Sequence, residues 1–386
     1  MRFRHLRGNF FPRTDDLWDM SSLDGARRAG RLIPRVLVSV VLFAAVAACG
    51  IGSSPSAGRQ AATSAPPPAV AKPTTYPLTI DNCGRKVTFD APPKRVVLLN
   101  GTSVAEVESF IVLGIQDHIL ANSQSYEVSD DPSFVDRIKA IPRANLKLNE
   151  NFEVPREQVL ALKPDLVVST WAGGFDDKIG SVTRDQLDAA GIKSFVTPSN
   201  CANGDLNARP EDKERYEKQS VESSYELLLS LGEIFDVQQR AADQVNKARA
   251  DIAAIRKEVA GRERKHVLVV YPGMSMMNNN GLPAVFGGGL SDDIVDRAGG
   301  VNPFAGKTNT QLAEINAEAL ASAQVDVLVV GLFQPGEKAD VMAQDLFAKF
   351  PYWQASKSKT FTSVSDSFYL GPLNTVAIRK IADAAR

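Results

Sequence analysis

The sequence predicts an α/β protein of two Rossmann-like lobes, each with a parallel sheet, joined by one long backbone helix. Continuous apolar runs alternate with helical stretches over both halves of the chain, which is typical of parallel sheets covered by helices. Between residues 209 and 260 the pattern is helical throughout. A helix-then-strand phrase also occurs twice, as REQVLALKPDLVV (156–168) and AEALASAQVDVLVV (317–330).

The repeated phrase places the same residues at the same spacing in each half. A glutamate precedes an aspartate by eight residues in both copies, as Glu157 with Asp165 and as Glu318 with Asp326. The copies are 161 residues apart. Two lobes of one organisation account for this repetition, because each lobe then contains the same helix-then-strand unit.

The first lobe is predicted over residues 76–210. It opens with a hairpin about an Asn-Cys-Gly turn, where apolar residues alternate on both sides. The later apolar runs are continuous, so we expect buried strands of a parallel sheet. These strands are expected at 95–100, 118–122, 165–170 and 194–198, with helices at 103–115, 156–164 and 184–192.

The long helix falls within a helical segment predicted over residues 211–262. Its apolar stripe consists of Val237, Ala241, Val245, Ala248, Ile252, Ile255 and Val259. These residues recur every three or four positions, as one face of a helix requires. The stripe predicts a helix of roughly 23 residues and roughly 35 Å, which is long enough to connect two lobes.

The second lobe is predicted over residues 263–386. We expect strands at 266–271, 325–331 and 360–364, and helices at 290–299, 315–324, 344–350 and 375–385. The stretch GGVNPFAGKT (299–308) has one residue too many for a phosphate-binding loop and no strand feeding it. We interpret it as a glycine-rich turn after a helix.

The N-terminus carries the pattern of a secretory signal, predicted over residues 1–48. Arginines precede an apolar run from Val36 to Ala48, which is followed by Cys49. That run is too short to span a bilayer, which needs about 20 residues. V-A-A-C resembles the bacterial lipobox, so Cys49 is expected to become the lipidated first residue. Whether translation starts at Met1 or Met20 stays open.

Residues 49–75 are predicted to form the lipidated cysteine and a disordered tether, because Pro, Ala, Ser and Thr dominate and little could enter a core. The protein would then be held at the outer face of the cytoplasmic membrane by its lipid alone. In that compartment disulfides persist, so we expect the two remaining cysteines, Cys83 and Cys201, to be bonded to each other.

Bulk charge and missing motifs exclude several functions. A net charge of −1 gives no reason to expect a nucleic-acid partner. Three histidines and no paired metal-ligand spacing argue against direct capture of zinc or manganese. No residues form a pattern of nucleophile, base and orienting group, so we do not expect an enzyme.

The body of the chain resembles the bacterial solute-binding lipoproteins that feed ABC importers for iron–siderophore complexes, haem and cobalamin. The resemblance covers residues 76–386, and its markers include PPKRVVLLN (92–100), EQVLALKPDLVV (157–168) and SDDIVDRAGGVN (291–302). The cysteine pairing matches actinobacterial members, so that origin is expected. The resemblance implies a monomer with no covalently bound cofactor apart from the lipid, and no metal site of its own.

The resemblance also implies a docking role for Glu157 and Glu318, one at the top of each lobe. They would meet arginines on the two subunits of an ABC permease dimer. The alternative is that both glutamates are simply favoured at helix N-termini by the helix dipole.

Ligands of open parallel sheets bind beyond the carboxyl ends of the strands, so the cleft between the lobes is the expected site. The candidate ligand-binding residues are Tyr126, Arg143, Trp171, Phe175, Asn278, Phe286, Phe333, Gln334 and Tyr369. Alternatives are open for three of them. Phe333 fits core as well as pocket, Phe286 fits a role in seating its own loop, and Arg143 fits a surface ion pair.

We therefore expect a receptor that captures an iron–siderophore complex and delivers it to the permease. Haem or a cobalamin-like corrinoid is the alternative ligand within the class, although no residue is fixed as an axial ligand. A surface enzyme and a non-catalytic envelope scaffold are the alternatives from other classes.

Overall fold

The structure, a computed structural model, describes residues 71–386 apart from 102, 126 and 278–280. The predicted signal, the lipidated Cys49 and most of the tether lie outside the described residues, as do Tyr126 and Asn278. Within the described part of the chain, no helix combines the length and apolar content needed to cross a membrane.

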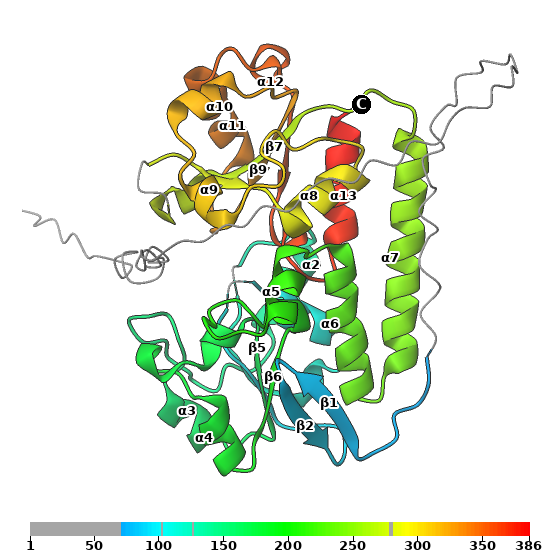
Figure 1. Cartoon of the computed structure of the whole chain (residues 1–386), viewed down its shortest axis with the longest axis vertical. Helices are drawn as coiled ribbons and strands as arrows, with labels where there is room; N and C mark the ends of the chain where they lie inside the picture. The colour runs from blue at the N-terminus through cyan, green and yellow to red at the C-terminus, as the bar shows by residue number, and fades with distance from the viewer. Residues whose placement is uncertain (1–70, 102, 126, 278–280) are drawn as a thin grey trace, which may run out of the picture. The chain divides into compact units, whose positions relative to one another are not determined.

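The first lobe is built on a four-stranded parallel sheet (Figure 1). Its strands are β3 (Val96–Leu98), β4 (Ile119–Asn122), β5 (Leu166–Ser169) and β6 (Lys193–Val196), in the order β4-β3-β5-β6. Successive side chains of a strand point to opposite faces. Val96 and Leu98 accordingly join one hydrophobic cluster and Val97 another. Both faces are covered, which explains the continuous apolar runs.

The second lobe repeats this plan with one difference. Its strands are β7 (Val267–Tyr271), β8 (Ala284–Phe286), β9 (Val327–Gly331) and β10 (Phe361–Val364), in the order β10-β9-β7-β8. β7, β9 and β10 are parallel, whereas β8 pairs antiparallel with β7. Among the residues that the structure describes, the short connection into β8 contains only the 3-10 helix η6 (Pro272–Met277). A parallel neighbour needs a longer crossover, usually a helix, so the chain returns antiparallel.

The remaining elements follow the predicted alternation. A hairpin of β1 (Leu78–Asn82) and β2 (Arg85–Phe89) precedes the first sheet. The α-helices are α1 (Ala105–Val112), α2 (Pro132–Lys139), α3 (Arg156–Ala161), α4 (Arg184–Ala189), α5 (Pro210–Glu217), α6 (Val221–Ile234), α7 (Gln238–Val259), α8 (Gly289–Arg297), α9 (Asn309–Ala313), α10 (Ala317–Ser322), α11 (Ala339–Lys349), α12 (Gln354–Ser358) and α13 (Asn374–Ala384). The 299–308 segment is a turn after α8, as expected.

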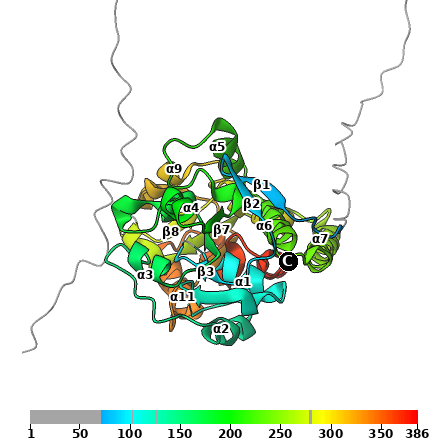
Figure 2. The ribbon, with the colours of Figure 1, turned by 90° about the horizontal axis from the view of Figure 1, so that it is seen from below.

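Helix α7 is the predicted backbone helix and has 22 residues. It packs against α6 (Figures 1 and 2) and against α13 of the second lobe, which lies on the same side of α7 in Figure 1. Its buried residues are Ala241, Ala242, Val245, Ile252 and Ile255. A single hydrophobic cluster runs from Leu98 of β3 through Ile252 of α7 to Val269 of β7. The lobes therefore share a core through this helix, which limits their relative motion.

The aspartates of the repeated phrase have the same structural role in each lobe. The Asp165 carboxylate accepts hydrogen bonds from the backbone N–H groups of Lys94 (2.7 Å) and Arg95 (2.9 Å), just before β3. The Asp326 carboxylate accepts from the N–H of His266 (2.8 Å), just before β7. β5 and β9 occupy corresponding places beside β3 and β7. Each aspartate thus fixes the entry of the neighbouring strand.

Replacing either aspartate by alanine should destabilise the protein. Asp165→Ala and Asp326→Ala remove hydrogen bonds between a carboxylate and backbone N–H groups, and each should lower the free energy of unfolding by about 2 kcal/mol. Urea denaturation measures the loss. Asp345→Ala, at an exposed position of α11, is the matched control and should change stability by less than about 0.5 kcal/mol. A loss no larger than that of the control would refute the role.

Candidate functional site

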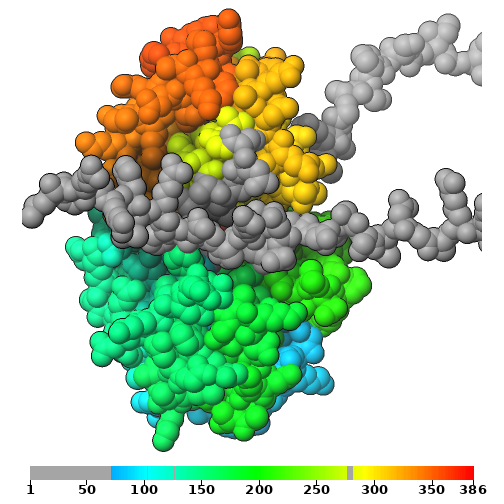
Figure 3. Space-filling model, turned by 90° about the vertical axis from the view of Figure 1, so that its left-hand side faces the viewer, coloured from blue at the N-terminus to red at the C-terminus, as the bar shows by residue number. Residues whose placement is uncertain are grey.

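The loops at the carboxyl ends of the two sheets contact one another across the boundary between the lobes. Asp130, in the loop after β4, accepts a hydrogen bond from the backbone N–H of Ser365, after β10, at 2.6 Å. The backbone N–H of Asp130 donates to Asp366 Oδ1 at 2.9 Å. Figure 3 shows the first lobe in green and cyan and the second in orange and yellow. The predicted ligand-binding loops therefore lie near this boundary.

An aromatic cluster lies at the carboxyl end of the second sheet. The Tyr271 ring centroid is 4.5 Å from that of Phe286 and 5.5 Å from that of Tyr369, and the centroids of Phe286 and Tyr369 are 5.9 Å apart. Phe286 and Tyr369 are half-buried, whereas Tyr271 is fully buried. The structure thus brings together two of the predicted residues, Phe286 and Tyr369.

Tyr271 was not singled out in the sequence because it ends a buried strand. Its ring needs the glycine at position 331 of the adjacent strand β9, since a Cβ atom there would lie 2.3 Å from the ring. The Tyr271 hydroxyl donates to the carbonyl oxygen of Ser365 at 3.0 Å. A glycine opposite an aromatic residue at a strand end is the signal that could have found it.

Both phenols of the cluster are held neutral. Burial is the main cause that raises the pKa of Tyr271 and that of Tyr369 above the ordinary value for tyrosine. The Tyr369 hydroxyl donates to Met274 Sδ at 3.5 Å. The cluster therefore presents aromatic carbon and uncharged hydroxyl groups, which suits a large ligand with apolar surface.

Phe333 and Gln334 lie in the loop after β9, which is tied by Glu337. Glu337 Oε2 accepts hydrogen bonds from the backbone N–H groups of Phe333 (2.6 Å) and Gln334 (3.1 Å). The same carboxylate covers Gly273, where a Cβ atom would lie 1.8 Å from Glu337 Oε1. Phe333 is partly buried against the shared core, and Gln334 is exposed.

Trp171 and Phe175 come from one loop of the first lobe and have different surroundings. The Trp171 ring is half-buried and lies on two glycines: a Cβ at Gly173 or Gly204 would lie within 2.5 Å of it. Phe175 is buried in the core of the first lobe, with the Arg184 guanidinium 6.0 Å from its ring centroid. In this conformation Trp171 has surface to offer a ligand, and Phe175 has almost none.

Arg143 lies in the loop after α2. It is exposed, and its carbonyl oxygen accepts a hydrogen bond from the backbone N–H of Leu146 at 3.0 Å. Its guanidinium forms no ion pair with any residue that the structure describes. The same part of the chain holds no group of three or more His, Cys, Asp or Glu placed to bind a metal ion.

A buried glutamate that the sequence analysis missed organises the loops of the first lobe. Glu106 of α1 is fully buried, and its carboxylate accepts hydrogen bonds from Thr170 Oγ1 (2.7 Å), Gln124 Nε2 (2.9 Å) and the hydroxyl of Thr197. These three donors follow β5, β4 and β6. Burial outweighs the hydrogen bonds and raises the pKa of Glu106. An acidic residue inside an otherwise apolar helical run was the available signal.

Glu153 is a second buried acid of the first lobe. It is 5% exposed, and its Oε2 has no hydrogen-bond partner among the described residues. Burial raises the pKa of Glu153 to about 8. The Glu153 carboxyl group thus binds its proton more tightly in the folded state than in the unfolded state.

The raised pKa of Glu153 should be visible in the pH dependence of stability. The contribution of Glu153 is fully present below the pKa of an ordinary glutamate and is lost as pH rises through about 8. The free energy of unfolding of the wild type, measured with urea, should therefore fall as pH rises. Glu153→Gln should remove on the order of 4 kcal/mol of that decline. Glu150→Gln, at a nearby exposed position, is the control. Equal pH profiles for wild type and Glu153→Gln would contradict the assignment.

Glu157 and Glu318 occupy equivalent positions on the two lobes. Each is exposed in the first turn of a helix, α3 or α10, that leads into β5 or β9. Arg156 Nη2 lies 2.8 Å from Glu157 Oε1. Hydrogen bonding at the start of the helix, and then Arg156, lower the pKa of Glu157. Glu157 is therefore ionised at neutral pH.

A surface pocket lies at the opposite, amino end of the second sheet. It has a volume of about 470 Å³, and its lining includes His266, Asp326 and Tyr352. Ligands of parallel sheets bind at the carboxyl ends of the strands, where the aromatic cluster lies. The pocket is thus separate from the candidate site.

Comparison with known proteins identifies the family. The family described as periplasmic binding protein matches residues 100–360. The chain belongs to this family. Periplasmic binding proteins carry solutes to ABC importers and are not enzymes. Membership of the family supports a location outside the cytoplasm for this protein. The resemblance of the sequence to ABC solute-binding proteins is confirmed at this level. No curated protein matches the sequence.

Solved structures of periplasmic binding proteins share the fold. One is an ABC-type Fe3+-hydroxamate transport system protein from Saccharomonospora viridis, with 24% identity, a TM-score of 0.57, and coverage of 80% of this chain and 99% of that chain. A periplasmic binding protein from Veillonella parvula has 17% identity, a TM-score of 0.60, and coverage of 80% and 96%. The haem-binding protein HutB of Vibrio cholerae has 16% identity, a TM-score of 0.53, and coverage of 75% and 97%. At these identities the matches support the two-lobed architecture.

Proposed function

We propose that this protein is the lipid-anchored solute-binding component of an ABC importer, and that it captures an iron–siderophore complex between its lobes. The observation that carries the proposal is the cluster of Tyr271, Phe286 and Tyr369 at the carboxyl end of the second sheet. In the first lobe, hydrogen bonds from Gln124 and Thr170 to the buried Glu106 hold the loops after β4 and β5 in place. A mainly apolar wall with a few polar groups suits a bulky chelate.

The similar protein from Saccharomonospora viridis supports the ligand class, because it is described as part of an Fe3+-hydroxamate transport system. HutB, by contrast, is described as binding haem. In this chain the hydroxyls of Tyr271 and Tyr369 each donate to a protein atom. A ferric hydroxamate needs no axial ligand from the protein, so we favour it over haem.

Ligand titration of the mature chain tests the proposal. Ferric hydroxamate, haem and cobalamin are added separately while tryptophan fluorescence is followed. We expect quenching by ferric hydroxamate, and an affinity at least about 10-fold lower for Tyr369→Ala. Tyr352→Ala, at a residue that is 80% exposed at the other end of the sheet, is the aromatic control. Tight binding of haem alone would overturn the ligand class, and no binding of any ligand would favour a scaffold.

The anchor is tested on the full chain. Mass spectrometry of the membrane fraction should find a diacylglyceryl group on Cys49. Cys49→Ala should move the protein out of that fraction without changing its ligand affinity. An unmodified N-terminus that retains the apolar run would refute the lipid anchor.

A further inference from the structure

Two buried carboxylic acids meet at the boundary between the lobes. Glu108 lies on α1 of the first lobe and is 1% exposed. Asp366 begins the 3-10 helix η7 (Asp366–Phe368) of the second lobe and is 4% exposed. The Glu108 carboxylate faces the turn that Asp366 begins, because a Cβ atom at Gly371 would lie 3.4 Å from Glu108 Oε2. Asp366 is the acid that acts most strongly on Glu108. Acids in contact inside a protein need a proton between them or a cation beside them.

After the surrounding hydrogen bonds are counted, Glu108 and Asp366 each keep one carboxyl oxygen without a partner in the part of the chain that the structure describes. Asp366 Oδ1 accepts from the backbone N–H of Asp130 at 2.9 Å and from Ser365 Oγ at 3.1 Å. Asp366 Oδ2 and Glu108 Oε1 are buried and have no partner among the described residues when both acids are ionised. A proton on one acid converts this contact into a hydrogen bond from a carboxyl group to a carboxylate.

The nearby cation already has a partner. Lys380 of α13 forms an ion pair with Asp130, whose side chain is 4% exposed. Glu106 on the same helix adds further negative charge. On α2, Arg137 donates to the carbonyl oxygen of Ile111 at 3.2 Å, and on α6 burial raises the pKa of Tyr225. In the described part of the chain, no lysine, arginine or histidine forms an ion pair with Glu108 or Asp366.

Asp366 belongs to the turn that carries Tyr369. Asp366 is three residues before Tyr369, and the backbone N–H of Tyr369 donates to the carbonyl oxygen of Asp366 at 3.0 Å. Farther along, the backbone N–H of Gly371 donates to Ser224 Oγ at 3.0 Å. Asn374 Nδ2 donates to the carbonyl oxygen of Tyr369 at 2.7 Å. A change at Asp366 therefore reaches the aromatic cluster through one short turn.

We propose that Glu108 and Asp366 share one proton across the boundary between the lobes, and that its loss loosens the turn at residues 365–371 and weakens ligand binding. The effect on the ligand rests on the proposed function, whereas the shared proton does not. An ionised pair would place two adjacent buried carboxylates between the lobes, and their repulsion would push the lobes apart.

The direction of the pH effect follows from the environment. Burial first, and then the Asp366 carboxylate, raise the pKa of Glu108 well above the ordinary value for glutamate. The stabilisation is fully present below that ordinary value and is lost as pH rises through the raised pKa. The phenols of Tyr271 and Tyr369 also have raised pKa values, mainly through burial.

Urea unfolding across pH tests the shared proton without any ligand. For wild type, the unfolding equilibrium constant should rise by up to about 10-fold per pH unit from this site. Glu108→Gln keeps a hydrogen-bond donor beside Asp366 and should remove this site's contribution to the pH dependence of the unfolding equilibrium constant. Asp366→Asn should do the same. The double variant should remove no more than either single variant, because only one proton is shared. The proposal would be overturned if the single variants kept the wild-type pH dependence of unfolding, or if the double variant lost the sum of what the two single variants lose.

Ligand affinity across the same pH range tests the link to the binding site. The dissociation constant for ferric hydroxamate should rise by about 10-fold or more with pH in wild type and stay flat in Glu108→Gln. Glu153→Gln is the matched control, because Glu153 is a buried acid of the first lobe with a raised pKa. It should alter the pH dependence of stability and keep the pH dependence of affinity. If the dissociation constant of Glu108→Gln rose with pH as it does in wild type, the link between the proton and the binding site would be refuted. Failure of every ligand to bind would refute the proposed function alone.

Discussion

Replacing Glu157 and Glu318 together by glutamine should reduce uptake through the importer by roughly 100-fold or more while ligand affinity stays unchanged. Both carboxylates are exposed in the first turn of helices that lead into corresponding strands of the two sheets. The family resemblance implies a permease dimer with one arginine socket on each subunit, which a carboxylate on each lobe would match. Charge-assisted pairs between carboxylate and guanidinium groups supply both affinity and orientation.

A role in helix stability alone predicts a different result. A carboxylate in the first turn of a short helix contributes through the helix dipole, so its loss would change stability slightly and leave uptake intact. Asp340→Asn is the matched control, because Asp340 is an exposed carboxylate in the first turn of α11 that lies outside the repeated phrase. Reconstituted uptake and ligand titration are measured on the same preparations. Uptake of the double variant equal to that of Asp340→Asn would refute docking through these residues.

The single variants add a test of symmetry. Glu157→Gln and Glu318→Gln should each weaken uptake, and the double variant should lose more than either, because each carboxylate has its own socket. Glu157 differs in having Arg156 beside it at 2.8 Å, so its charge is partly compensated in the free protein. We therefore expect Glu318→Gln to have the larger single effect.

The sheets and the long helix could be predicted because their signals are local. Strands buried on both faces read as continuous apolar runs, and the α7 stripe keeps a helical period over 22 residues. The reversal at β8 had no such signal, because three residues, Ala284–Phe286, are too few to show a direction. Direction there depends on the connection and not on the strand itself.

The binding site was predictable only in part, because burial of a loop residue depends on partners far away in sequence. Phe286 and Tyr369 were chosen as aromatic residues after strands, and they do lie together. Phe175 met the same criterion, yet Arg184 and the core of the first lobe cover it. Glu106 and Glu108 appeared as ordinary helix residues, since their partners at 170, 197 and 366 belong to other elements.

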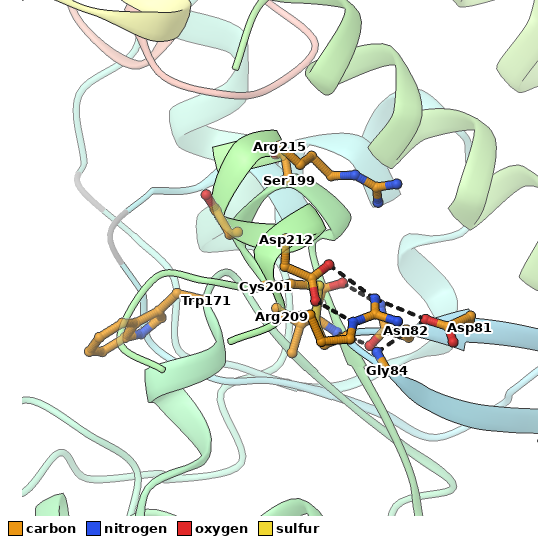
Figure 4. The surroundings of a disulfide bond; sticks show 12 residues. Asp81, Asn82, Gly84, Trp171, Ser199, Cys201, Arg209, Asp212 and Arg215 are labelled. Atoms are coloured by element: carbon orange, nitrogen blue, oxygen red, sulfur yellow. Dashed lines mark hydrogen bonds and ion pairs between the residues drawn. A yellow bond between two sulfur atoms is a disulfide. The ribbon is translucent and has the colours of Figure 1, made fainter. Parts of the chain in front are cut away.

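The predicted disulfide is present and connects the hairpin to the segment after β6. Cys83 and Cys201 are bonded across 118 residues. Beside it, Asn82 Nδ2 donates to the carbonyl oxygen of Val196 at 2.8 Å. Figure 4 shows Arg209 between Asp81 and Asp212, with the Trp171 ring pointing away from them. The disulfide thus lies within a polar network that fixes the hairpin against the first lobe.

The segment after Cys201 also supports Trp171. The backbone N–H of Gly173 donates to the carbonyl oxygen of Asn203 at 3.0 Å. Gly204 packs against the Trp171 ring, where a Cβ atom would lie 2.5 Å away. Because Cys201 precedes both residues closely, release of the disulfide should loosen the surface on which this indole rests.

Removing the disulfide should therefore lower stability and change the environment of Trp171. Cys83→Ser combined with Cys201→Ser should reduce the free energy of unfolding by about 4 to 5 kcal/mol, because the unfolded chain loses a long closed loop. Urea denaturation measures this loss, and wild type in reducing agent should match the variant. Under native conditions the Trp171 emission should shift, whereas Trp353, which is 2% exposed in the second lobe, should not change. A loss below about 1 kcal/mol would mean that the surrounding polar network fixes the hairpin without the covalent bond.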